Sequence, residues 1–316
     1  MHRPQETNRP LRLLSSPVPV RSILFSVGGR LRPGGPVDCR HQWLSQTRSL
    51  FVSSAMAAAC LVAATIVCSA AVADEPAGWG SLRGRFLLKG DVPEQELLDI
   101  TRDEDVCGPH QLRDESLRVD PESRGIANIV LWIDSRTEVP VHPDLKEFSE
   151  EKPLIDNQKC RFEPRIVRLR VGESLQISNT DPIAHNVAVY CTRNQPFATV
   201  IPQGDPLEHI FKRAEPRPVR VDCSIHAWMR SYLVITEHPY SAVSQKTGEF
   251  ELKNLPAGEW KFRFWQERIG YLPSTLLSHP AVTQDEGFVT IKVTAGETVD
   301  LGDLQLTVSD LTPALK

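Results

Sequence analysis

A cysteine, a histidine and a methionine follow one another at intervals of three residues in the segment 221–235, VDCSIHAWMRSYLVI. They are Cys223, His226 and Met229, and a second histidine, His185, lies upstream in the segment AHNVAVY. A thiolate, two imidazoles and a thioether are the donors of a blue-copper site, with a Cys–His2 plane and a weak axial Met. One short loop can deliver three of the donors while another strand supplies the fourth.

Each of these residues also has a simpler interpretation. A cysteine at the end of a strand is most often an apolar filler or half of a disulfide. His185 follows Asp181-Pro182 and can be a hydrogen-bonded turn residue, and Met229 alone indicates almost nothing. Their spacing, chain order and inward strand parity agree with one another, however, and this agreement favours a metal site.

The elements that must position these residues are strands. Short alternating runs broken by Gly, Pro, Asn and Asp follow Asp74, and helical periodicity is weak. RIVRLRVGESLQISNTDP predicts two strands, AHNVAVY a third with His185 on its core-facing side, and RPVRVDCSIH a fourth that Cys223 ends. With the alternating YLVITE, the pattern predicts an antiparallel β-sandwich over residues 155–237.

A second group of strands is predicted over residues 238–310. SAVSQKTGEFELKNLPAGEWKFRFW alternates aromatic with charged residues between turns, and GFVTIKVTAGETVDLGDLQLTV gives two more strands. Strands are also predicted at 80–90 and 127–135, within an N-terminal region 80–137. This region either stands apart or completes the second sandwich, in which case the first sandwich is an insertion. The predicted fold class is all-β.

Charge is unevenly distributed along the chain. The whole sequence has a formal net charge of -4, but residues 1–73 hold eight arginines against one Glu and one Asp. The remainder is therefore more acidic than the whole, which argues against binding to nucleic acid.

An uncharged apolar segment, LFVSSAMAAACLVAATIVCSAAVA, follows Arg48 and ends in Ala-Val-Ala just before Asp74. This pattern predicts that residues 1–73 are a leader with a signal peptide cleaved near Ala73, and that the product is exported, for example to a periplasm. A retained membrane anchor over 50–72 is the alternative, because the run is about long enough to span a bilayer.

Residues 160–237 resemble the cupredoxin family, and in particular its amicyanin-like branch with a short ligand loop. The matching motifs are VGESLQISNTDPIAHNV and VDCSIHAWMRSYLVI. The resemblance implies a Greek-key β-sandwich that holds one type 1 copper ion. The copper ligands it implies are His185, Cys223, His226 and Met229. It also suggests that Asn186 ties the two ligand segments together by hydrogen bonds.

The downstream segment AVSQKTGEFELKNLPAGEWKFRFW is similar to transthyretin-like β-sandwiches called carboxypeptidase regulatory-like or carbohydrate-binding-like modules. The whole arrangement resembles exported cupredoxin-containing proteins labelled methylamine utilization proteins, a label that names a genomic setting. The two resemblances cover roughly residues 80–270. They imply a one-electron carrier rather than an enzyme. The alternatives are copper storage or delivery, or binding of cell-wall carbohydrate through Trp260 and Trp265.

A carrier needs an exit for its electron. The ring edge of His226, with Trp228 beside it, is the predicted exit, and Pro182 and Ile183 add to an apolar docking patch. The expected partner is a redox protein, a cytochrome c or a dehydrogenase, bound in a small transient interface. The acidic body suits a basic patch on that partner.

Cys39, Cys60 and Cys68 lie in the leader, which leaves four cysteines for the exported part. We favour a disulfide between Cys107 and Cys160, with Cys191 as the odd thiol. The remaining histidines of the exported part are interpreted as surface residues; they are His110, His142, His209, His238 and His279. The exported part contains no His-x-His pair, so the additional copper sites of multicopper oxidases lack their usual ligands.

Overall fold

The computed structural model describes residues 77–134, 138–204, 206–273, 279–280, 282–285 and 288–312. Over these residues the chain is almost entirely β, and the predicted all-β fold class is confirmed. The predicted leader 1–73, with its signal peptide and the alternative anchor over 50–72, lies outside the described residues. In the described part, no helix is long and apolar enough to cross a membrane.

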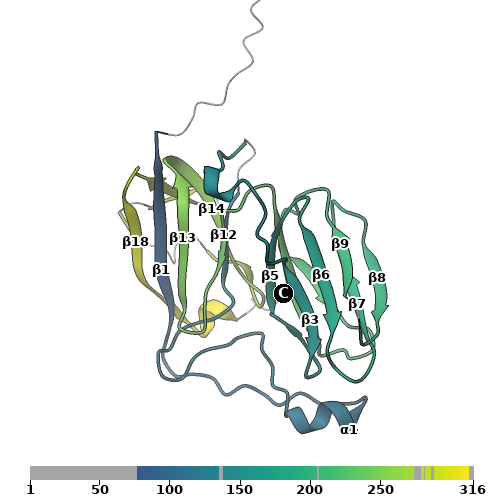
Figure 1. Cartoon of the computed structure of the whole chain (residues 1–316). Helices are drawn as coiled ribbons and strands as arrows, with labels where there is room; N and C mark the ends of the chain where they lie inside the picture. Colours follow the sequence, from purple (N-terminus) through teal and green to yellow (C-terminus); the bar gives the residue numbers. More distant parts are fainter. Residues whose placement is uncertain are drawn as a thin grey trace, which may run out of the picture. The chain divides into compact units, whose positions relative to one another are not determined.

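One sandwich carries the candidate ligands, and we call it the inserted sandwich. Its five-stranded sheet has the order β5-β11-β10-β7-β8, and its four-stranded sheet has the order β4-β3-β6-β9 (Figure 1). The strands are β3 (Leu154–Gln158), β4 (Arg161–Glu163), β5 (Ile166–Arg170), β6 (Ser174–Asn179), β7 (His185–Val189), β8 (Phe197–Ile201), β9 (Leu207–Ile210), β10 (Val219–Asp222) and β11 (Arg230–Thr236).

Alternation of side chains builds the core of this sandwich. In β6 every second residue is buried, and β10 buries Val219 and Val221 while Arg220 is exposed. The buried apolar residues of these two strands share one core with Cys223 and Met229; they are Leu175, Ile177, Val219 and Val221. Fully burying an aliphatic side chain stabilises the fold by ~1.5–3 kcal/mol, so the core fixes which face each strand turns inward.

Strand direction differs from the sequence prediction, which was antiparallel. β3 pairs with β6 in parallel and β5 pairs with β11 in parallel, while the other pairs of this sandwich are antiparallel. Alternation shows which side chains face the core, but it carries no information on which strand lies alongside or in which direction it runs.

The other sandwich, which we call the host sandwich, is formed by sheets of order β13-β1-β18 and β12-β2-β14-β17-β16, with β15 paired to β14. Its strands are β1 (Trp79–Lys89), β2 (Val130–Ile133), β12 (Ser241–Val243), β13 (Glu249–Pro256), β14 (Gly258–Gln266), β15 (Gly270–Tyr271), β16 (Val282–Asp285), β17 (Phe288–Val293) and β18 (Thr298–Thr307). Its apolar core is separate from that of the inserted sandwich.

The two strands that precede the inserted sandwich belong to the host. β1 lies between β13 and β18, and β2 lies between β12 and β14. The chain therefore leaves the host sandwich after β2, forms the inserted sandwich, and returns with β12. Trp132 of β2 and Ser241 of β12 are direct partners across this pair.

A small apolar cluster and a buried ion pair join the two sandwiches. The cluster consists of Val130, Trp132 and Trp265 from the host with Ile166, Tyr232 and Val234 from the inserted sandwich. Beside it, Arg165 donates to Glu267 through Nε (3.0 Å) and Nη2 (2.6 Å). Only 10% of the Arg165 side chain and 5% of the Glu267 side chain are exposed.

His238 is buried, although the sequence prediction placed it at the surface. Its Nε2 lies 3.0 Å from the carbonyl oxygen of Ile133, and its Nδ1 accepts a hydrogen bond from the backbone of Tyr240. Burial lowers its pKa to about 4. The charged and proline neighbours suggested a surface position, but this is the point where the chain re-enters the host sandwich. His110 is exposed, and His142, His209 and His279 are half-buried.

Glu215 fixes the loop that joins β7 to β8. Its carboxylate is 6% exposed and accepts hydrogen bonds from Thr192, Arg193 and Asn194. Burial would raise the pKa of Glu215, but these hydrogen bonds outweigh it and lower the pKa to about 2. The charged carboxylate therefore stabilises the fold above pH ~4.5, and this contribution is lost as the pH falls toward 2.

We expect Glu215→Gln to lower the free energy of unfolding at pH 7 by about 3 kcal/mol, since each unit of pKa shift corresponds to ~1.4 kcal/mol. Denaturant unfolding at pH 7 and at pH 3 measures this loss, which should be smaller at pH 3. The exposed Glu259→Gln is the control and should change little at either pH. An equal loss for Glu215→Gln at both pH values would show that the carboxylate charge does not stabilise the loop.

Candidate metal centre

Strand pairing brings the candidate ligands together. β7 and β10 are antiparallel neighbours, with Val189 opposite Val221, so the start of β7 lies beside the end of β10. His185 is the first residue of β7, and Cys223 directly follows β10. His226 lies in the loop between β10 and β11. Residues distant in sequence thus meet at one end of the inserted sandwich.

Three of the four predicted ligands form a buried donor group. The Nδ1 atoms of His185 and His226 are 3.0 Å apart, and His226 Nδ1 is 3.8 Å from Cys223 Sγ. One donor atom from each residue lies within 4.8 Å of the others. Both histidines are 0% exposed and the cysteine is 2% exposed. Bonds of ~2.0–2.3 Å from Zn²⁺ to imidazole and thiolate give the scale of such a site. A small shift of these side chains therefore brings all three to one ion.

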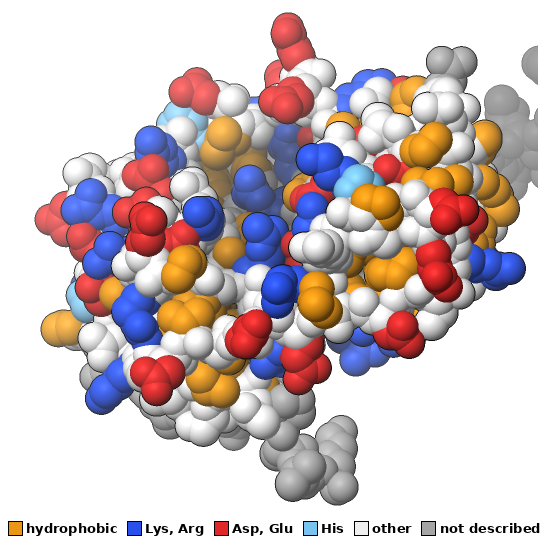
Figure 2. Space-filling model, turned by 90° about the horizontal axis from the view of Figure 1, so that it is seen from below, with side chains coloured by type: hydrophobic (Ala, Val, Ile, Leu, Met, Phe, Trp, Pro, Cys, Tyr) orange, Lys and Arg blue, Asp and Glu red, His pale blue; other side chains and the backbone are white. Residues whose placement is uncertain are grey.

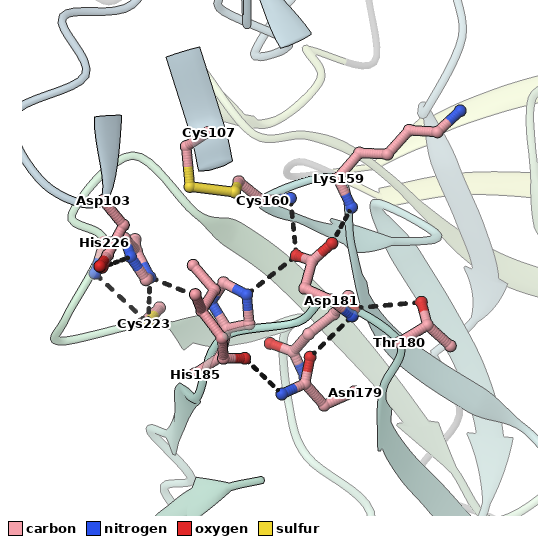
Figure 3. A network of polar contacts seen from close by, with 12 residues as sticks. Asp103, Cys107, Lys159, Cys160, Asn179, Thr180, Asp181, His185, Cys223 and His226 are labelled. Atoms are coloured by element: carbon pink, nitrogen blue, oxygen red, sulfur yellow. Dashed lines mark hydrogen bonds and ion pairs between the residues drawn. A yellow bond between two sulfur atoms is a disulfide. The ribbon is translucent and has the colours of Figure 1, made fainter. Parts of the chain in front are cut away.

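A carboxylate holds the far edge of each ring. His185 Nε2 lies 2.9 Å from Asp181 Oδ2, and His226 Nε2 lies 2.8 Å from Asp103 Oδ2. A carboxylate oxygen accepts, so each Nε2 donates and carries the ring proton. Each Nδ1 then presents its lone pair toward the other and toward the sulfur, as Figure 3 shows. Lone pairs converging in a buried site are stabilised by a cation, so the donor set fits a metal ion.

The environment of His185 favours its neutral form. Burial lowers the pKa of His185 and the neighbouring His226 lowers it further, while the hydrogen bond with Asp181 opposes both effects. Neutral imidazole is the form that binds a metal.

Hydrogen bonds hold the sulfur and join the two ligand segments. Cys223 Sγ accepts from the backbone N–H groups of Asn186 and His226, both at 3.4 Å. The Asn186 side chain accepts from the backbone N–H and the hydroxyl of Ser224 and donates to the carbonyl oxygen of Thr199. Asn186 therefore links β7 to β8 and to the loop that follows Cys223.

Met229 closes the same loop. Its carbonyl oxygen accepts from Cys223 N–H (3.2 Å), and its N–H donates to the carbonyl oxygen of His226 (2.9 Å). The side chain is 1% exposed and belongs to the core that contains Cys223. The backbone thus brings Met229 close to the donor group, and its role as an axial ligand stays a prediction.

The predicted disulfide between Cys107 and Cys160 is present. Cys191 and Cys223 are the free cysteines of the described residues, and both are buried. Burial raises the pKa of Cys191 to about 12, so this thiol is neutral at ordinary pH. Only Cys223 of these two belongs to the donor group, so Cys191 is the odd thiol.

The predicted electron exit is covered. Residues 98–112, which we call the cover segment, contain the helix α1 (Glu104–Cys107) and pack against Ile183 and Trp228. The indole N–H of Trp228 donates to the carbonyl oxygen of Cys160 (3.1 Å), and His226 has no exposed surface. The predicted exit at the ring edge of His226 is therefore not exposed at the surface, while Ile183 and Trp228 are half-buried and Pro182 is exposed.

Sequence reasoning missed both carboxylates. Asp181 had a signal, since it lies four residues before His185 in the loop that leads into β7. Asp103 had none, because 123 residues separate it from His226 and its segment has no strand periodicity.

The described chain is thus an all-β protein with a buried Cys–His2 group at the end of one sandwich. No protein-family model matches it, and no curated protein matches it significantly. Among solved structures it is similar to the Cu-containing nitrite reductase (NirK) from Thermus scotoductus SA-01, with 20% identity and a TM-score of 0.25. That match covers 30% of this chain and spans only 25% of the reductase chain.

Two smaller proteins are matched over almost their whole length. A purple cupredoxin from Nitrosopumilus maritimus has 20% identity and a TM-score of 0.23, over 27% of this chain and 99% of the cupredoxin. Amicyanin from Paracoccus versutus has 17% identity and a TM-score of 0.24, over 33% of this chain and 96% of amicyanin. At these scores the likeness carries no functional inference, which comes from the residues of the donor group.

Proposed function

We propose that this protein binds one copper ion through His185, Cys223 and His226, with Met229 as an axial ligand, and acts as an exported one-electron carrier. The observation that carries the proposal is the convergence of two imidazole Nδ1 atoms and one thiol sulfur in a buried site. A His2Cys set with a nearby methionine is the donor combination of blue-copper electron-transfer sites.

The surroundings of the donors suit repeated oxidation and reduction of a bound copper ion by one electron. Strand pairing, the backbone hydrogen bonds to Cys223 and the two carboxylates restrain His185, Cys223 and His226. Such a frame offers the same ligands to both oxidation states of copper, which reduces the rearrangement that electron transfer requires. A carrier rather than an enzyme is proposed, because the donors are buried beneath the cover segment.

Copper titration of the metal-free protein tests this proposal. We expect one equivalent of Cu(II) to saturate the protein and to give an intense visible absorption from sulfur-to-copper charge transfer. Ascorbate should bleach the colour and an oxidant should restore it, while Zn(II) should give no colour. A protein that binds Cu(I) tightly but stays colourless with Cu(II) would instead support copper storage or delivery.

Export and the partner are also proposals. Export is supported by the leader pattern and by the Cys107–Cys160 disulfide, since disulfides persist in oxidising compartments. A redox protein is the proposed partner, and a cytochrome c or a dehydrogenase would suit this role. Figure 2 shows Lys and Arg side chains interspersed with Asp and Glu over the face seen from below.

The carbohydrate alternative finds no specific support. Trp265 is 8% exposed and packs edge-on against Tyr232 in the contact between the sandwiches. Trp260 is half-buried against the core of the host sandwich, and its indole N–H donates to the carbonyl oxygen of Pro256. Trp265 is therefore not presented as an open stacking platform, and Trp260 is only partly exposed.

A further inference from the structure

We propose that Asp103 is a positioning residue of the metal site, which orients the His226 ring and closes its edge to solvent and to docking partners. The inference rests on the proposed copper site. It concerns a residue of the cover segment, which lies outside both strand groups.

The hydrogen bond between Asp103 and His226 is short, and it joins a partly exposed carboxylate to a fully buried ring. Asp103 Oδ2 lies 2.8 Å from His226 Nε2, and the Asp103 side chain is 39% exposed while that of His226 is 0% exposed. Asp103 thus stands between the ring and the solvent. By accepting from Nε2, it leaves the Nδ1 lone pair free for the metal.

The backbone holds Asp103 in a defined position. Its φ of 49° lies in the left-handed region, which few residues other than glycine adopt, although aspartate adopts it more readily than most. Asp103 directly precedes α1, and its carbonyl oxygen accepts from the N–H groups of Val106 (3.0 Å) and Cys107 (2.8 Å) in that helix. Cys107 is in turn bonded to Cys160 of the inserted sandwich. The covalent anchor of the cover segment is therefore only one helical turn from Asp103.

The same disulfide connects the partners of both ligand rings. Asp181, which holds His185, also accepts from the backbone N–H groups of Lys159 (2.6 Å) and Cys160 (2.8 Å). The backbone N–H of Cys107 donates to the carbonyl oxygen of Asp103, and that of Cys160 donates to the Asp181 carboxylate. Figure 3 shows the disulfide and the contact between Cys160 and Asp181. The disulfide links the two carboxylates into one frame around the donor group.

Two consequences follow for the loaded site. Loss of a hydrogen-bonding partner of a metal ligand typically costs ~10–100-fold in metal affinity, so Asp103 should contribute an effect of that size. Electrons must also reach the copper by a route other than the His226 ring edge, because Asp103 and the cover segment occupy it.

The test compares the whole protein with Asp103→Ala, Asp103→Asn and Asp105→Ala. Asp105 is the matched control, since it is an exposed aspartate of the same short helix. Copper affinity is measured by competition with a chelator. We expect a 10–100-fold loss for Asp103→Ala, a smaller loss for Asp103→Asn, which keeps an acceptor oxygen, and no change for Asp105→Ala.

Two measurements on the metal-free protein separate positioning from general stability. Nitrogen-15 NMR of the histidines should report Nε2–H for His226 in the wild type and an altered tautomer distribution in Asp103→Ala. Diethyl pyrocarbonate should modify His226 slowly in the wild type, and faster in Asp103→Ala and in Cys107→Ser/Cys160→Ser.

The outcomes distinguish this inference from the proposed function. Wild-type protein that binds no copper would overturn the proposed function, while the metal-free measurements would still decide the role of Asp103. If both Asp103 variants kept wild-type copper affinity, ring signals and modification rates, Asp103 would not position His226. Equal effects of Asp105→Ala and Asp103→Ala would also overturn the inference.

Discussion

Cys223→Ser is expected to abolish the intense visible absorption of the copper-loaded protein and to weaken copper binding by more than ~100-fold. Loss of a partner to a ligand costs ~10–100-fold, and loss of the thiolate ligand itself should cost more. The colour arises from the sulfur–copper bond, so a serine oxygen cannot replace it. Visible spectra and chelator competition measure the two effects.

Cys191→Ser is the matched control for this variant. Cys191 is the other free, buried cysteine of the described residues, but it is not part of the donor group. Its substitution should leave the spectrum and the copper affinity unchanged. A coloured Cys223→Ser protein, or a colourless Cys191→Ser protein that is still folded, would show that the thiolate has been assigned to the wrong residue.

Glu267→Ala is expected to lower the free energy of unfolding by about 3–5 kcal/mol. Removing one partner of a buried ion pair leaves an uncompensated charge, here the guanidinium of Arg165, in the contact between the two sandwiches. Denaturant unfolding of the two proteins measures the difference.

The Arg85–Asp303 pair provides a control with similar geometry and different burial. Its two hydrogen bonds are both 3.0 Å, but 38% and 47% of the two side chains are exposed. Asp303→Ala should therefore lower the free energy of unfolding far less than Glu267→Ala does. Similar losses for the two variants would mean that burial of the Arg165–Glu267 pair has no special effect on stability.

Much of the architecture could be predicted from alternation alone. The inward parity of β6 and β10 is readable because inward and outward residues alternate along a half-buried surface, whereas every residue of β7 is buried. The grouping of His185, Cys223 and His226 follows from the same parity together with their spacing, and the structure brings these three together. The Cys107–Cys160 disulfide was also predicted correctly.

The remaining features depend on contacts that leave no periodic trace. β3 pairs with β6, and β5 pairs with β11, in parallel. Each pair joins strands that are not consecutive in the chain, and side-chain alternation does not indicate such pairing. The cover segment has only short helical turns, and one disulfide and one carboxylate connect it to the donor end of the inserted sandwich. For this reason the covered edge of His226 could not be predicted, although the predicted donors converge.

The pairing of β2 with β12 has a consequence for how such a protein can be rebuilt. Trp132 and Ser241 are neighbours across that pair, so the inserted sandwich leaves and rejoins the host sandwich at adjacent points. A module whose two ends meet can be exchanged or excised with a short connecting turn, because the framework around it keeps its own strand order. The host sandwich could therefore accept a different domain inserted between β2 and β12.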